Sequence, residues 1–127
     1  MPYDRRPLFW VGSSRDDLKR FPTDVQDVMG YALHLAQCGE RHGGAKALRG
    51  FGSAGVVEIV DDYDRATFRT VYTVSFADAV YVLHAFQKKS KRGVATPPRD
   101  IELIKARLRR AGEHHERWQR ERDSDAT

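Results

Sequence analysis

Cysteine and long apolar runs are nearly absent from this chain. Cys38 is the one cysteine in 127 residues, so the sequence offers no internal disulfide. The apolar run at residues 8–11 is too short for the core of a signal peptide. No run approaches the roughly 20 residues that a membrane span needs. We therefore expect a cytoplasmic protein and exclude a disulfide-rich secreted scaffold.

Motifs for metals and cofactors are lacking as well. His34 and Cys38 stand four residues apart, and His114 and His115 lie near the C-terminus. Neither pair supplies three ligands at a recognised spacing. No glycine-rich phosphate loop and no Ser-His-Asp signature is present. We expect neither a metal site nor a cofactor.

Positive charge is abundant but unevenly distributed, and the formal net charge is +4. Residues 1–80 contain 10 Lys and Arg against 11 Asp and Glu, whereas residues 81–120 contain 11 against 4. This concentration favours a polyanionic partner such as nucleic acid. A solubilising basic helix explains it about equally well.

The apolar pattern of the first half predicts one strand and two helices. Residues 8–11 have the pattern of a buried strand. A short helix begins after residues 13–14 and ends at residues 21–22. Residues 25–36 carry apolar side chains at helical spacing, which is typical of one buried stripe. Five glycines within residues 41–55 predict a long mobile loop.

Three antiparallel strands follow, at residues 56–60, 67–76 and 79–87. Their connections are too short for a parallel return. Alternation places Arg69 and Tyr72 on opposite faces of the middle strand. In the last strand it predicts a shared face for Val80, Val82, His84 and Phe86.

The C-terminal region predicts a helix that begins after Thr96, with Pro97 as its first residue. Past Gly112 the chain is almost wholly charged, so residues 113–127 are expected to fray. The predicted fold class is α+β, with one domain at residues 1–112. It has a four-stranded, mostly antiparallel sheet, two N-terminal helices on one face and a C-terminal helix. The other face is expected to be partly open to a ligand.

Five short segments occur in a particular order along residues 8–111. They read Lys-Ala-Leu-Arg-Gly at 46–50, Val-Glu-Ile at 57–59, Phe-Arg-Thr-Val-Tyr at 68–72, Val-Leu-His-Ala-Phe-Gln-Lys-Lys-Ser at 82–90, and Thr-Pro at 96–97. This set resembles the RelE/ParE superfamily of bacterial toxins, in particular its phage-derived HigB-like branch. That branch usually has Arg after the Glu-x of its second strand, where this chain has Val60.

The resemblance implies a RelE-like fold and a toxin of a type II toxin–antitoxin system. Its activity is then ribosome-dependent, metal-independent cleavage of mRNA, which inhibits translation. The implied partners are mRNA on the ribosome and a cognate antitoxin, often one with a helix-turn-helix domain.

Metal-free RNA cleavage needs a base for the 2′-hydroxyl proton, cations for the charge that develops on phosphorus, and an acid for the leaving oxygen. Arg69 suits the phosphate, because a guanidinium stays charged and binds two oxygens at once. A salt bridge with Glu58 explains Arg69 equally well. Lys88 and Lys89 are candidate bases, because crowded lysines have lowered pKa values.

The remaining candidates are aromatic or basic. Tyr72 and His84 are further catalytic candidates, although both residue types are more often core residues in strands. A second group is expected to bind RNA by base stacking or phosphate contact, namely Lys46, Arg49, Phe86, Lys91 and Arg92.

Two other functions remain open. A ParE-like gyrase inhibitor would bind a protein and perform no chemistry. A catalytically inactive nucleic-acid-binding or regulatory module is suggested by Val60. The basic cluster around Lys88 favours the nuclease. The sequence leaves open the codon preference, the identity of the base and the acid, the oligomeric state and the face that the antitoxin covers.

Overall fold

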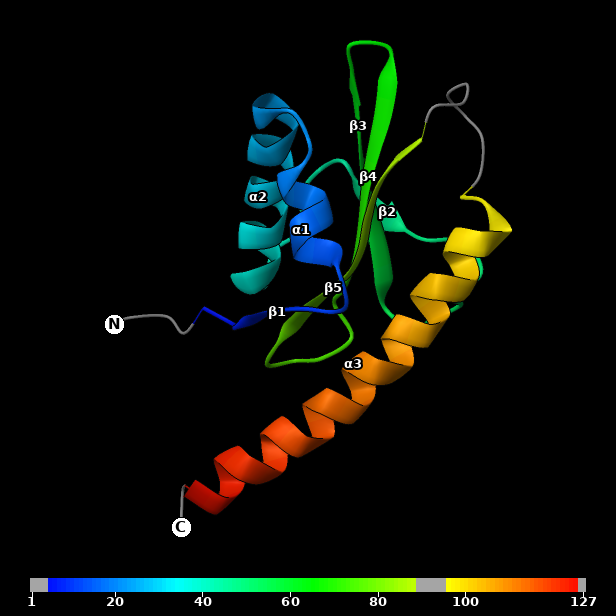
Figure 1. The fold of residues 1–127 in the computed structure, drawn as a ribbon. Helices are drawn as coiled ribbons and strands as arrows, with labels where there is room; N and C mark the ends of the chain where they lie inside the picture. Colours follow the sequence, from blue (N-terminus) through cyan, green and yellow to red (C-terminus); the bar gives the residue numbers. More distant parts are fainter. Residues whose placement is uncertain (1–4, 89–95, 126–127) are drawn as a thin grey trace.

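The structure is a computed structural model that describes residues 5–88 and 96–125 (Figure 1). In chain order its elements are β1 (Leu8–Trp10), α1 (Ser14–Lys19), α2 (Thr23–Gln37), β2 (Ala45–Ala47), β3 (Val56–Tyr63), β4 (Ala66–Thr73), β5 (Val80–Lys88) and α3 (Pro98–Asp125). No helix in this part of the chain is long and apolar enough to cross a membrane.

The strands form one mixed sheet in the order β1-β5-β4-β3-β2. β1 runs parallel to β5, and the other neighbours are antiparallel. The α+β class and the C-terminal helix are confirmed, but the prediction of four strands is wrong. Ala45–Ala47, expected within a loop, adds β2 at the edge of the sheet by pairing with β3. Three residues with small or charged side chains carry too little apolar pattern to reveal a strand.

Helices α1 and α2 cover one face of the sheet (Figure 1). The predicted stripe of α2 is buried there against β3, β4 and β5. The core includes Val25, Met29, Leu33, Val57, Ile59, Phe68 and Tyr72. Burial of the strand residues among them fixes the register of the central strands, because a shift by one residue would turn these side chains to the opposite face of the sheet.

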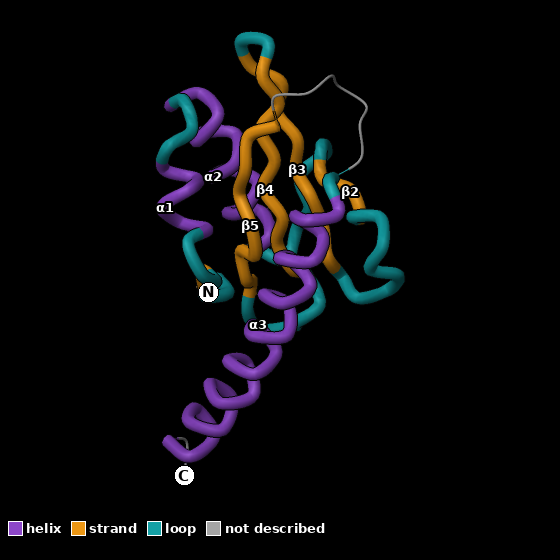
Figure 2. The backbone as a smooth tube through the Cα atoms, turned by 45° about the vertical axis from the view of Figure 1, so that its right-hand side comes forward, coloured by secondary structure: helices purple, strands orange, loops and turns teal. Residues whose placement is uncertain are grey.

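Helix α3 crosses the opposite face (Figure 2). Ile104 is fully buried against this face, in a cluster with Val71, Tyr81 and Leu83. The expectation that the chain frays past Gly112 is not met, because α3 continues to Asp125 and its last turns extend past the sheet (Figure 2).

One carboxylate holds this distal part of α3. Asp78, before β5, accepts hydrogen bonds from His115 Nε2 at 2.6 Å, Arg122 Nη2 at 2.8 Å and Gln119 Nε2 at 3.4 Å. Trp118 adds a ring contact with Phe9, whose centroid lies 5.5 Å away. Long-range contacts of this kind explain why a charged sequence forms an ordered helix here.

A β-bulge in β5 corrects the predicted faces of this strand. The register shifts between Val71 and Tyr72, which pair with His84 and Val82. One extra residue on β5 reverses the alternation beyond it. Val80 and Val82 therefore pack under α1 and α2, whereas His84 and Phe86 lie on the face of α3.

Candidate functional site

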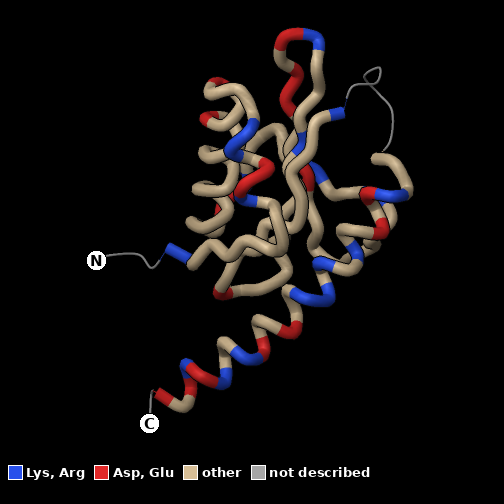
Figure 3. The backbone as a smooth tube through the Cα atoms, in the orientation of Figure 1, with Lys and Arg blue, Asp and Glu red and all other residues tan. Residues whose placement is uncertain are grey.

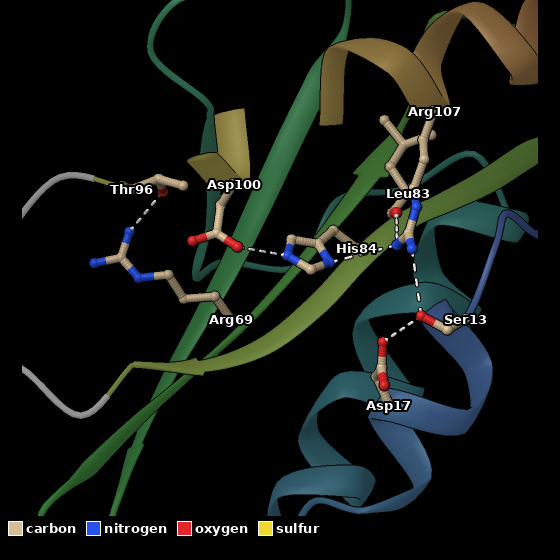
Figure 4. A network of polar contacts seen from close by, with 8 residues as sticks. All are labelled: Ser13, Asp17, Arg69, Leu83, His84, Thr96, Asp100 and Arg107. Carbon is tan, nitrogen blue, oxygen red and sulfur yellow. Dashed lines mark hydrogen bonds and ion pairs between the residues drawn. The ribbon is translucent and has the colours of Figure 1, made fainter. Parts of the chain in front are cut away.

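The bulge brings His84 under the first turns of α3, at the centre of a polar network (Figure 4). Its Nε2 lies 2.8 Å from Asp100 Oδ1, and its Nδ1 lies 3.4 Å from Arg107 Nη1. The residue is only 7 % exposed. Burial lowers the pKa of His84, and the nearby Asp100 carboxylate partly opposes that shift. A neutral ring that donates from Nε2 and accepts at Nδ1 satisfies both neighbours.

Arg107 joins three parts of the chain through this network (Figure 4). It donates to the carbonyl oxygen of Leu83 at 2.9 Å and to Ser13 Oγ at 3.3 Å. Ser13 in turn donates to Asp17 Oδ2 at 2.7 Å. These bonds tie α3 to β5 and to the start of α1. Gly12 leaves room for the guanidinium, since an added Cβ there would lie 2.8 Å from it.

Arg69 lies on the same face, one strand further across the sheet. It is 7 % exposed, and its Nη1 lies 3.2 Å from both Glu58 Oε2 and Thr96 Oγ1. The salt bridge with Glu58, weighed against a phosphate-binding role from the sequence, is therefore present. A guanidinium paired with Glu58 and Thr96 in this way is held in one orientation.

Lys88 ends β5 on this face, where it pairs with Thr67. The residue is 7 % exposed. Burial and the positive charge of Arg69 lower the pKa of Lys88, and Glu58 and Asp100 counteract them. A lysine with a lowered pKa is a better general base near neutral pH than an exposed one.

Phe86 pairs with Arg69 across β4 and β5 and precedes Lys88 by two residues on β5. Its ring stacks on the imidazole of His84, with centroids 4.6 Å apart and planes 18° from parallel. It is half-buried, so part of the ring stays open to a ligand.

The other predicted site residues are more dispersed. Tyr72 is 1 % exposed on the opposite face of the sheet, in the core under α2. Lys46 is exposed on edge strand β2, paired with Glu58, and Arg49 is exposed in the loop that follows. The predictions for Lys89, Lys91 and Arg92 lie outside the described residues.

A hollow of about 330 Å³ opens beside the network. It is lined by Asp17, Arg20, Phe21, His84, Ala85, Phe86 and Gln87. β1 pairs with β5 only at Val80, Tyr81 and Val82. The hollow lies along the next part of β5, at residues 84–87. The hollow is thus bounded by α1 on one side and by the Phe86 and His84 rings on the other.

Charge among the described residues of this region is mixed. Glu58 and Asp100 lie among the cations on the face of α3, and Asp61, Asp62 and Asp64 cluster at the β3–β4 turn (Figure 3). Within residues 5–88 and 96–125, no group of three His, Cys, Asp or Glu side chains has an arrangement that fits a metal ion.

Sequence reasoning assigned no role to Asp100 or Arg107. A signal was present, because Asp100, Ile104 and Arg107 follow the i, i+4, i+7 spacing of one helical face. Ser13 and Asp17 gave no such signal, since they join the network through the Arg107–Ser13 bond, whose two residues are 94 positions apart in the chain.

Comparison with known proteins gives one match. No curated protein and no solved structure is significantly similar to the chain. A family described as phage-derived protein Gp49-like (DUF891) matches residues 16–109, from within α1 to within α3. The match covers β2 to β5 and every residue of the polar network except Ser13. The chain therefore belongs to the Gp49-like family of phage-derived proteins.

Proposed function

We propose that this protein is the toxin of a toxin–antitoxin pair and cleaves mRNA on the ribosome without a metal ion. The observation that carries the proposal is the presence of Arg69, Lys88 and Phe86 on one sheet face, beside an open hollow. Arg69 offers a cation for the phosphate, Lys88 a base, and Phe86 a surface on which a nucleobase can stack.

In the proposed reaction, the neutral amine of Lys88 removes the 2′-hydroxyl proton. The 2′-oxygen attacks phosphorus, and the bond to the 5′-oxygen breaks as that oxygen takes a proton from water. Arg69 stabilises the negative charge on the phosphoryl oxygens. His84 has both ring nitrogens engaged by Asp100 and Arg107. We therefore assign His84 a positioning role, in which its ring supports the ring of Phe86 as that ring stacks on a nucleobase of the RNA.

The proposed partner is an antitoxin encoded beside the toxin, of the helix-turn-helix type. Its absence should make the toxin lethal, whereas its co-expression should restore growth. Expression alone is expected to arrest growth and to leave truncated, translated mRNAs, which primer extension maps. Intact mRNAs with damaged DNA would support gyrase inhibition instead, and unaffected growth would support the inactive binding module.

The role of Arg69 cannot be tested by its substitution alone, because the Glu58 carboxylate would then be buried without its partner. Breaking a buried ion pair costs about 3–5 kcal/mol, which would confuse loss of activity with loss of folding. We therefore remove both charges together, in the double variant Arg69→Gln/Glu58→Gln. This variant should lose cleavage at least about a hundredfold relative to the native protein while it retains the circular dichroism of the native fold.

Lys88→Arg separates charge from basicity. Arginine keeps the positive charge but stays protonated, so it cannot accept the 2′-hydroxyl proton. Cleavage should fall by about 10²–10⁴-fold. For the native protein, the rate should rise with pH and level off below 10.5, the ordinary pKa of lysine. An unchanged rate for Lys88→Arg would remove Lys88 from the role of base.

A further inference from the structure

The hollow beside β5 combines two opposite charges with an aromatic wall. Asp17 is half-buried and Arg20 is exposed, and both come from α1 or the residue after it. Phe86 and His84 form the wall. A space of about 330 Å³ is ample for one nucleobase.

The two charged groups select for a particular pattern of donors and acceptors. A carboxylate only accepts hydrogen bonds, and a guanidinium only donates them. Guanine presents N–H donors at N1 and N2 on one edge and the acceptors O6 and N7 on another, and Arg contacts with O6 and N7 are the commonest specific base contacts. Asp17 has acceptor capacity left, because Ser13 occupies only one site of its carboxylate.

We propose that this hollow binds a guanine base of single-stranded RNA, with Asp17 at the N1/N2 edge, Arg20 at O6/N7 and Phe86 stacked on the ring. The inference rests on the proposed function, since it names the base that the same site selects.

The position of the hollow fits a nucleotide whose phosphate contacts Arg69. Arg69 on β4 pairs with Phe86 on β5, and the hollow lies on the far side of β5. Neighbouring strands are about 4.8 Å apart. A step of one or two strands is comparable to the distance between the phosphate and the base of one nucleotide.

The other nucleobases match the hydrogen-bonding groups of Asp17 and Arg20 less well. Adenine has a single amino donor for Asp17, and O6 is absent for Arg20. Uracil offers one N–H donor, which lies between two carbonyl oxygens. Those oxygens would face the Asp17 carboxylate, which can only accept hydrogen bonds. Each mismatch leaves a charged group without its partner, and a lost bidentate contact corresponds to roughly a tenfold to hundredfold weaker binding.

The test uses the purified full chain and the four nucleoside 3′-monophosphates, titrated separately by NMR. We expect 3′-GMP to bind at least about tenfold more tightly than the 3′-monophosphates of adenosine, cytidine and uridine. Asp17→Asn should abolish that preference. The matched control is Asp16→Asn, an exposed neighbour that does not line the hollow, and it should retain the preference.

A second control separates base recognition from the polar network. Ser13→Ala removes the hydrogen bond to Asp17 but leaves its carboxylate in the hollow, so the preference for 3′-GMP should persist. Equal binding of the four nucleotides, or an unchanged preference in Asp17→Asn, would overturn the proposal.

Failure of the two proposals gives different results. If the native protein cleaves mRNA at sites without guanine enrichment, and binds the four nucleotides equally, only the guanine site is wrong. If it prefers 3′-GMP but leaves mRNA intact in growing cells, the guanine site stands and the nuclease is wrong.

Discussion

At the scale of single residues, the buried histidine couples stability to pH. Burial lowers the pKa of His84 in the folded protein, so between that value and 6.5 the unfolded chain binds a proton that the folded protein does not. Stability from this group is complete above pH 6.5 and falls as the solution becomes more acidic.

We predict that the free energy of unfolding decreases from pH 7.5 to pH 5, by at most about 1.4 kcal/mol per pH unit from this group. Urea denaturation at several pH values measures it. His84→Gln keeps a donor for Asp100 but does not titrate, so its dependence should be flatter. His34→Gln, at an exposed position, is the control and should keep the native slope. Equal slopes in all three proteins would contradict the assignment.

Gly12 is a second position where one residue decides the packing. Its φ is +59°, and an added Cβ would lie 2.8 Å from the Arg107 guanidinium. We predict that Gly12→Ala destabilises the protein by about 1–3 kcal/mol, because it combines backbone strain with displacement of Arg107. Gly43→Ala, where nothing lies within 4 Å of the added Cβ, should change stability far less in the same thermal denaturation assay.

At the scale of elements, the apolar pattern predicted the strands and helices whose side chains build the core. The stripe of α2 is buried because Val25, Met29 and Leu33 recur at helical spacing. The pattern could not show the bulge in β5, since a regular strand places Leu83 and His84 on opposite faces, whereas the bulge turns both toward α3. It is the paired strand β4 that determines which residue is the extra one.

The extension of α3 depends on contacts outside its own sequence. Gly112 looks like a helix end, yet it lies in the interior of α3 with open space around it. We predict that Gly112→Ala raises stability by about 0.5–1 kcal/mol, because alanine loses less backbone entropy in a helix. Thermal denaturation checks this, and a lower midpoint would show that this position is not held as regular helix in solution.

A substitution of Asp78 tests whether its hydrogen bonds hold residues 113–125 of α3 in place. Burial raises its pKa, but hydrogen bonds from His115, Arg122 and Gln119 outweigh this and lower it overall. Its stabilisation is present above pH 3.8 and is lost as the pH falls through the lowered pKa. Asp78→Asn should cost about 1–2 kcal/mol and speed amide hydrogen exchange in residues 113–125. Asp123→Asn, exposed on the same helix, should do neither.

At the scale of the whole molecule, the charge asymmetry pointed to a polyanion but not to where it binds. Basic residues of the sequence are dispersed over β2, β4, β5 and α3, and acids lie among them (Figure 3). The candidate site was therefore predictable in part. Arg69, His84 and Lys88 come from the sequence, whereas Asp100, Arg107, Ser13 and Asp17 required the fold.

Salt dependence tests whether RNA lies along the face of α3. Binding of single-stranded RNA should weaken with salt, and each lost phosphate contact should reduce the slope of log K against log salt by about 0.7. We predict this reduction for Lys46→Ala, on the strand edge beside Glu58. Arg5→Ala, which removes a cation near His34 on α2, should leave the slope unchanged. Equal slopes for Lys46→Ala and the native protein would place the RNA elsewhere.

The parallel pairing of β1 with β5 has a consequence for biosynthesis. The first strand made has no neighbour in the sheet until residues 80–82 have been synthesised, and Asp100 and Arg107, which hold the polar network together, come later still. A nascent chain thus cannot assemble the network until the segment through Arg107 has been synthesised. The β1–β5 pairing and the network are therefore late steps in the folding of the described chain, because each joins an early residue to a late one.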